Sequence, residues 1–169
     1  AALLENVRGS CEELGASVLC RRLDLRNQEH LDRLPGEGMA RFGRIDVLVN
    51  NAGAPSPRRP AVEIDRQGWG AVLDVSLTGT FFLTQALGRH WIRTGTGGSV
   101  VSLSSTHGTV GIANHAPYGV AKAGISHMTR MLAIEWAGYG IRVNAVAPGT
   151  TITETRRHVI EDGTTHHRL

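Results

Sequence analysis

Short apolar runs rich in β-branched residues alternate with long segments of helical periodicity along this 169-residue chain. Strands that alternate with helices assemble into a parallel sheet linked by crossover helices, so this alternation is the strongest constraint on the fold. The chain is therefore predicted to form an α/β structure around a parallel sheet. The apolar spacing predicts helices over residues 2–14, 28–42, 65–91 and 118–137, and strands over residues 17–23, 45–49, 99–103 and 141–147.

Some local features refine this prediction. Pro35 lies inside the segment 28–42 and should kink or break that helix, because proline lacks the amide donor that a helix interior requires. The runs 45–49 and 99–103 are typical of strands that are covered on both faces. From Thr150 onward the chain is polar and has no strong period.

Polar and small residues follow the predicted strands directly. They are Asp24, the run from Asn50 to Gly53, Ser104 with Ser105, and the run 148–153. In open parallel sheets, ligands bind beyond the carboxyl ends of the strands. The sequence therefore predicts a binding site along this edge of the sheet.

The composition argues against several other classes of function. The formal net charge is +3 and arginine is scattered without forming a run, which favours neither a nucleic-acid nor a membrane partner. Cys11 and Cys20 fit neither a redox pair nor half of a zinc site, so free thiols in a reducing, cytoplasmic compartment are expected. No apolar stretch is judged long enough to span a bilayer. No metal site is predicted, because no cysteine or carboxylate cluster accompanies His158, His166 and His167.

Tyr118 and Lys122 are four residues apart at the start of a predicted helix, which places them on one face. A free tyrosine, with a pKa near ~10, is a poor base at neutral pH. A nearby ammonium group favours the phenolate form. The pair can therefore act as a general acid/base, although this spacing also arises by chance in many helices.

Ser105 precedes Tyr118 by thirteen residues and follows a strand, where its hydroxyl can donate a hydrogen bond to a substrate carbonyl. The alternative is that Ser104 and Ser105 only satisfy backbone groups of a turn, which suits Ser104 better. Asp24 can accept from an adenine amino group or cap the next helix. Gly53 permits close backbone approach, or it belongs to a plain strand-to-loop turn.

Several motifs, taken in order, resemble the single-domain branch of the short-chain dehydrogenase/reductase family. They are NNAG at 50–53, the serine thirteen residues before YGVAK at 118–122, and IRVNAVAPG at 141–149, with agreement also at 42–53 and 77–87. The resemblance runs from about Leu3 to Thr155. It implies a Rossmann-like, doubly wound, three-layer fold, with residues 1–169 forming a single partial NAD(P)-binding domain.

The resemblance also implies an oxidoreductase that transfers a hydride between NAD or NADP and a carbonyl or secondary alcohol. Tyr118 would be the acid/base, Lys122 its activating partner and a ribose ligand, and Ser105 the residue that positions the substrate oxygen. His107 and His115 lie where a pocket wall would form, facing a small-molecule substrate. The implied cofactor contacts, besides Tyr118 and Lys122, are Asp24, Leu25, Asn51, Ala52, Gly53, Pro148, Gly149, Thr151 and Thr153.

The sequence departs from the family's pattern in identifiable places. The glycine-rich phosphate loop, the first two strands and the last strand have no counterpart here. Because the family orders its strands 3-2-1-4-5-6-7, a two-strand gap would separate segments 17–23 and 45–49. An unstable chain, or non-native pairing of these two segments, is expected. Ser76 stands where the family usually has an asparagine that holds a water of the proton relay, so the relay is expected to differ.

Other functions and assemblies remain open on the sequence. A catalytically silent scaffold subunit is favoured by the absent phosphate loop and by Ser76, and opposed by the intact Ser105, Tyr118 and Lys122. A sugar-nucleotide epimerase or dehydratase is disfavoured by NNAG and by the short length. In relatives, the counterparts of helices 65–91 and 118–137 pack between subunits, which implies a homodimer or homotetramer. The alternative is that both helices bury their apolar faces on the sheet alone.

Overall fold

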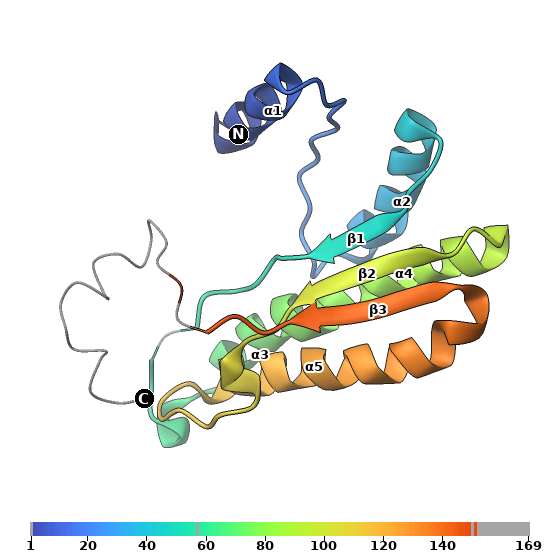
Figure 1. Cartoon of the computed structure of the whole chain (residues 1–169). Coiled ribbons are helices and arrows are strands. Elements are labelled where there is room, and N and C mark those ends of the chain that lie inside the picture. The colour runs from blue at the N-terminus through green and yellow to red at the C-terminus, as the bar shows by residue number, and fades with distance from the viewer. Residues whose placement is uncertain (1, 57, 150, 152–169) are drawn as a thin grey trace.

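A parallel sheet lies at the centre of the structure, a computed structural model that describes residues 2–56, 58–149 and 151. The described residues form three strands, in the order β1 (Val47–Asn50), β2 (Gly98–Leu103) and β3 (Ile141–Val146). Val49 pairs with Val101, and Val101 pairs with Asn144. The predicted α/β fold with a parallel sheet is confirmed, because all pairings in this sheet are parallel (Figure 1).

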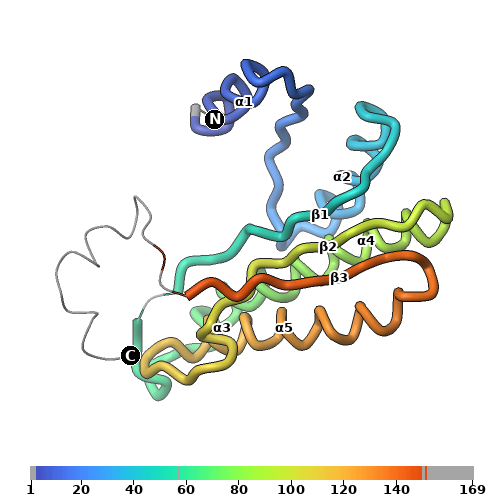
Figure 2. The backbone as a smooth tube through the Cα atoms, viewed as in Figure 1, coloured from blue at the N-terminus to red at the C-terminus, as the bar shows by residue number. Residues whose placement is uncertain are grey.

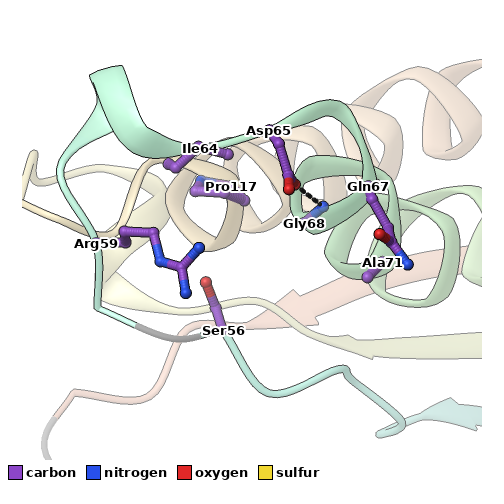
Figure 3. Close-up of a pocket in the computed structure, with 8 residues that line it drawn as sticks. All are labelled: Ser56, Arg59, Ile64, Asp65, Gln67, Gly68, Ala71 and Pro117. Carbon is purple, nitrogen blue, oxygen red and sulfur yellow. Dashed lines mark hydrogen bonds between the residues drawn. The ribbon is translucent and has the colours of Figure 1, made fainter.

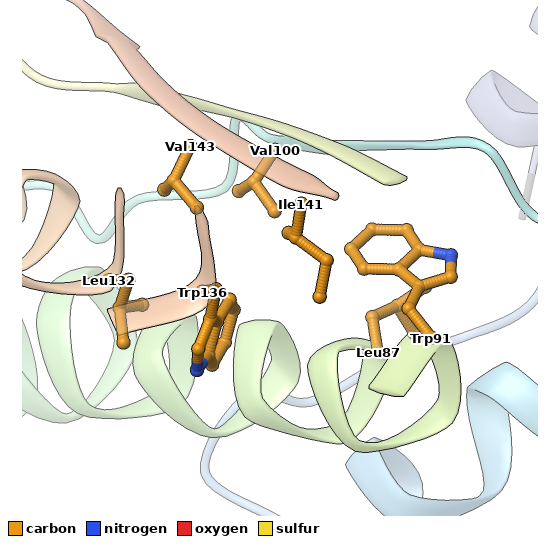
Figure 4. Close-up of a cluster of buried hydrophobic side chains, with 7 residues drawn as sticks. All are labelled: Leu87, Trp91, Val100, Leu132, Trp136, Ile141 and Val143. Atoms are coloured by element: carbon orange, nitrogen blue, oxygen red, sulfur yellow. The ribbon is translucent and has the colours of Figure 1, made fainter. Parts of the chain in front are cut away.

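Helices cover one face of the sheet (Figures 1 and 2). They are α2 (Gln28–Phe42), α3 (Arg66–Leu73), α4 (Thr80–Thr94) and α5 (Ala116–Trp136), with short turns at Ala61–Glu63, Thr106–Gly108 and Ala137–Tyr139. The indole of Trp91 is fully buried and donates a hydrogen bond to the Ile45 carbonyl over 2.7 Å. The main buried cluster, drawn in Figure 4, joins α4, α5 and the sheet through Leu87, Trp91, Val100, Leu132, Trp136, Ile141 and Val143.

The opposite face of the sheet is not covered by the described residues. Val47 and Val49 of β1 are 55% and 58% exposed, so the expectation that this strand is covered on both faces is wrong. Alternate residues of a strand point to opposite faces, and only one face meets a helical layer. Helix α1 (Ala2–Glu13) stands apart from the sheet in Figure 1. The described residues therefore form two of the three expected layers.

The segment 17–23 has no regular structure, so the predicted strand there is wrong. A strand needs a neighbour to satisfy its backbone groups, and in the described part of the chain β1 pairs only with β2. The non-native pairing of 17–23 with β1 does not occur either. Local sequence alone does not make a strand where no neighbouring strand edge is available for pairing.

The helix α2 runs through Pro35, so the predicted break there is wrong. Asn27 caps its start by accepting from the His30 amide, and Gly43 ends it in the left-handed conformation. The Pro35 ring is buried. The free energy gained by burying this ring offsets the loss of the one backbone hydrogen bond that the proline cannot donate.

The predicted helix 65–91 is present, but a π-helical segment, η2 (Asp74–Gly79), joins α3 to α4. Asp65 caps α3 by accepting from the Gly68 amide over 2.6 Å. By length and composition alone, the stretch Arg66–Thr94 is long and apolar enough to cross a membrane, which corrects the expectation that no such stretch exists. Because its residues Leu87 and Trp91 pack against the sheet, it is the core helix of this fold.

Candidate active site

Ser105 lies just beyond the carboxyl end of β2 and begins the turn Thr106–Gly108. Its buried hydroxyl accepts a hydrogen bond from the His107 amide over 3.2 Å and lies 3.4 Å from His107 Nδ1. The Ser104 hydroxyl instead donates to the Lys122 carbonyl over 2.9 Å. The turn-capping role expected to suit Ser104 better therefore falls to Ser105, whereas Ser104 ties β2 to α5.

Tyr118 and Lys122 lie on one face of α5, as predicted from their spacing. The Lys122 Nζ atom is 5.7 Å from the centroid of the Tyr118 ring. Pro117, in the first turn of the helix, has its backbone angle already set for helix entry. The helix therefore holds the ammonium beside the phenol ring.

Lys122 is 6% exposed and donates a hydrogen bond to the Leu103 carbonyl. Burial lowers the pKa of Lys122, because the charged form loses water contacts. In the part of the chain that the structure describes, no carboxylate forms an ion pair with this ammonium. Within these residues its charge is therefore not neutralised by an acid, and it lies beside the Tyr118 ring.

One histidine ring packs beside Tyr118, and a second histidine ring packs against the first. The His107 ring is 5.5 Å from the Tyr118 ring in an edge-on arrangement, and 5.2 Å from the His115 ring. Because His107 also contacts Ser105, it links the serine to the tyrosine. The residues predicted to form a pocket wall are thus brought together with two of the predicted catalytic residues.

The loop after β1 is held against the π-helical segment. The buried Ser76 hydroxyl accepts a hydrogen bond from the Ala54 amide over 3.0 Å. A β-carbon added to Gly53 would lie 3.7 Å from Ser76 Oγ and 4.0 Å from Lys122 Nζ. Gly53, Ser76 and Lys122 therefore meet at one point. Sequence reasoning singled out Ser76 but missed that it anchors this loop.

Asn50 also holds the site together, and sequence reasoning gave it no individual role. Its buried amide donates to Thr84 Oγ1 over 2.9 Å and to Ser102 Oγ over 3.1 Å. These bonds connect the ends of β1 and β2 to α4. The signal available in the sequence was a polar residue at the end of an apolar strand.

A cleft of about 420 Å³ opens at the carboxyl end of β1. It brings together four of the predicted cofactor residues, Asp24, Leu25, Ala52 and Gly53. Its lining is Arg22, Leu23, Asp24, Leu25, Arg26, Ala52, Gly53 and Val75.

The other predicted cofactor contacts do not line this cleft. Asn51 is exposed, and the Pro148 carbonyl accepts from the Thr106 amide over 3.2 Å, which places it beside the turn after Ser105. The Thr151 hydroxyl donates to the Gly149 carbonyl over 3.4 Å. Thr153 lies outside the described residues.

Asp24 is held by Arg26, whose guanidinium Nη2 lies 2.8 Å from the carboxylate. This hydrogen bond keeps the pKa of Asp24 well below its usual range. Asn27, and not Asp24, caps α2, so the capping interpretation of Asp24 is wrong. The carboxylate is exposed and stays ionised as an acceptor at the mouth of the cleft.

The cleft fits an anionic dinucleotide by the chemistry of its lining. Arg22 supplies a guanidinium group, a type of group that binds phosphate oxygens strongly, whereas the guanidinium of Arg26 is paired with Asp24. Gly53 leaves the backbone open to close approach. No group of three or more metal-ligating side chains occurs within residues 2–56, 58–149 and 151.

Comparison with known proteins relates the chain to a defined family. A family model described as enoyl-(acyl carrier protein) reductase matches residues 1–167. The cis-4-hydroxycyclohexanecarboxylate dehydrogenase of Sinomonas cyclohexanicum is 39% identical over 145 residues, which cover 86% of this chain and 58% of the relative. The chain thus spans less than two thirds of the length of this curated relative.

Solved structures agree with this relationship. Carveol dehydrogenase from Mycobacterium avium in complex with NAD has a TM-score of 0.82 and 32% identity, over 86% of this chain and 52% of that one. ElxO with NADPH bound has a TM-score of 0.81 and 29% identity, over 94% of this chain and 65% of that one. The family model matches nearly the whole sequence, and the chain shares its parallel-sheet fold with these solved structures. This chain therefore belongs to the short-chain dehydrogenase/reductase family.

Proposed function

We propose that the protein is an NAD- or NADP-dependent oxidoreductase that interconverts a secondary alcohol and a carbonyl, with Tyr118 as the acid/base. The observation that carries the proposal is the buried Lys122 ammonium, 5.7 Å from the Tyr118 ring and without an acid partner in the described part of the chain. Two relatives solved with NAD or NADPH support the cofactor class. The bound nicotinamide would supply or accept the hydride.

The residues of this chain divide the remaining work. In reduction, the Tyr118 phenol donates a proton to the substrate oxygen, and in oxidation its phenolate takes that proton back. The Ser105 hydroxyl donates a hydrogen bond to the same oxygen and stabilises the charge that develops there. His107 contacts both Ser105 and Tyr118 and, with His115, would form one wall of the substrate site.

Lys122 serves two partners at once. An ammonium group has three donors, and one of them is committed to the Leu103 carbonyl. The others remain for the ribose hydroxyls of the cofactor, while the positive charge lies beside the Tyr118 ring. Asp24, Leu25, Asn51, Ala52 and Gly53 would hold the adenosine half, with Pro148, Gly149, Thr151 and Thr153 toward the nicotinamide.

The test is a panel of secondary alcohols and carbonyls, assayed with NAD(H) and NADP(H) on the purified full-length protein. We expect turnover of at least one pair, and Tyr118→Phe should lower kcat by about 10²–10⁴-fold because it removes the proton donor. Tyr139→Phe is the matched control, since Tyr139 is exposed and lies in the turn that follows the far end of α5. Equal turnover by Tyr118→Phe and wild type would refute the role of Tyr118. No turnover with either cofactor would favour the scaffold alternative.

We infer that the full-length protein is a homodimer or homotetramer. Met131 and Ile134 of α5 are 54% and 79% exposed, so this helix does not bury its apolar residues on the sheet alone. Such exposed apolar stretches are typical of subunit contacts. Sedimentation equilibrium should give a mass above that of one chain, and a monomer would contradict the inference.

We also propose a cytoplasmic location and a single domain that includes residues 1–169. Cys11 and Cys20 are both free thiols, which supports a reducing compartment. Thiol titration of the purified protein under native, non-reducing conditions tests this. Two reactive thiols are expected, and a disulfide would argue against it.

A further inference from the structure

A second cavity lies between the loop after β1, the start of α3 and the start of α5 (Figure 3). Its volume is about 250 Å³, and it shares no lining residue with the cleft at the end of β1. Ile64, Ala71 and Pro117 give it an apolar wall. The volume is below the ~300–1,000 Å³ typical of small-molecule sites, so its occupant must be small.

The Ser56 hydroxyl faces this cavity in Figure 3. Its oxygen is buried and has no hydrogen-bond partner among the residues that the structure describes. A buried hydroxyl left without a partner is destabilising, and proteins rarely retain such groups. The Ser56 hydroxyl therefore needs a polar partner, and the cavity is where such a partner can bind.

The guanidinium of Arg59 points toward Ser56 in the same view. It forms no ion pair with any carboxylate in the described ranges. The one acid in the lining, Asp65, directs its carboxylate to the Gly68 amide at the start of α3, over 2.6 Å. The backbone of Arg59 is held by its own amide, which donates to the Asn114 carbonyl over 3.1 Å.

These groups together define the chemistry of a ligand. We propose that this cavity binds the carboxylate group of a small amphipathic molecule. The planar guanidinium of Arg59 pairs with both carboxylate oxygens, and the Ser56 hydroxyl donates to one of them. The apolar body of the ligand packs against Ile64, Ala71 and Pro117. This site goes beyond the proposed reaction, because none of its residues belongs to the proposed catalytic set.

The experiment measures binding of benzoate to the purified full-length protein by isothermal titration calorimetry, without substrate or cofactor. We expect saturable binding that Arg59→Gln weakens at least about ten-fold, because a charge-assisted pair is lost. Ser56→Ala should weaken it by a smaller factor. Arg58→Gln is the matched control: it removes the same charge from the adjacent exposed arginine, which does not line the cavity, and should leave the affinity unchanged.

Benzamide separates charge recognition from simple filling of an apolar space, since it has the same ring and no charge. We expect benzamide to bind at least about ten-fold more weakly than benzoate. The proposal is overturned if benzoate does not saturate a site, if benzamide binds as tightly, or if Arg59→Gln binds benzoate as wild type does. A cavity that holds only water gives the first of these outcomes. Because no turnover is measured, each result is independent of the proposed oxidoreductase activity.

Discussion

The side chain on which the proposed chemistry depends is Lys122, which is buried and has no acidic partner among the residues that the structure describes. Burial lowers its pKa, whereas a partner carboxylate would have raised it. The cost of desolvation is met in part by the hydrogen bond to the Leu103 carbonyl. The residue proposed to activate Tyr118 is therefore buried at a cost in stability, which is common at functional sites.

This arrangement predicts a pH dependence of stability. The folded-state pKa of Lys122 lies below its ordinary value of 10.5, so between these two values the unfolded chain binds more protons than the folded one. The free energy of unfolding should therefore gain from Lys122 as the pH rises through this window toward 10.5. When the free energy of unfolding is measured with urea across that range, its increase with pH should be less steep for Lys122→Met than for wild type. Identical slopes would mean that Lys122 is not desolvated.

At the scale of elements, the π-helical segment places Ser76 and also limits how the chain can pack. Gly79, at its end, touches the backbone of Leu25: an added β-carbon would lie 2.3 Å from the Leu25 carbonyl oxygen. Leu25 lines the cleft proposed for the cofactor. The contact between η2 and this segment therefore sets the position of the cleft wall.

Gly79→Ala is expected to destabilise the full-length protein by about 1–3 kcal/mol, because the backbone of Leu25 must move. It should also weaken cofactor binding, since the cleft wall moves with it. Gly36→Ala in α2 is the control, because its β-carbon would meet nothing within 4 Å and the change favours the helix by about 0.5–1 kcal/mol. Urea unfolding and cofactor titration measure both effects. Equal stability of Gly79→Ala and wild type would contradict the close contact.

Much of this architecture could be predicted from the sequence, because the spacing of apolar residues indicates which face of a helix or strand packs against the core. Strands 99–103 and 141–147 and helix 118–137 were predicted to within about two residues of their observed ends. The irregular structure of the segment 17–23 was not predicted. A strand forms only beside a neighbouring strand, and the spacing of apolar residues does not show whether that neighbour is present. The π-helical segment, an irregularity within one continuous helix, was also not predicted.

The candidate site shows the same division. The motifs around Ser105, Tyr118 and Lys122 pointed to these residues, and α5 brings Tyr118 and Lys122 side by side. The placement of Ser56 and Arg59 on the wall of one cavity was not predicted, because these residues lie in an irregular loop without a period. The hydrogen bond from the Arg26 guanidinium to the Asp24 carboxylate was not predicted either, because both residues are of the types found in a polar turn.

For the molecule as a whole, the described residues leave one face of the sheet and one edge of β1 without a cover. Val47 and Val49 are more than half exposed, and Leu3 of α1 is 81% exposed. Exposed apolar surface of this kind contributes little to folding and favours association. The stability of these 169 residues by themselves is therefore expected to be low.

The thermal transition of the purified 169-residue chain, followed by circular dichroism, should be broad. In a separate measurement, the same chain should bind a hydrophobic dye. The unpaired edge of β1 and the uncovered valines are the physical reason. The full-length protein is the control and should melt sharply. A single cooperative transition of the 169 residues, without dye binding, would contradict this prediction.

The most direct test of the proposed reaction centre is a double-mutant cycle on kcat/KM with Ser105→Ala, Tyr118→Phe and the double variant. If both hydroxyls act on the same substrate oxygen, the losses are not additive, and the double variant should be about as slow as the slower single variant. If the two losses multiply, Ser105 and Tyr118 act independently and the single reaction centre proposed for this protein is wrong.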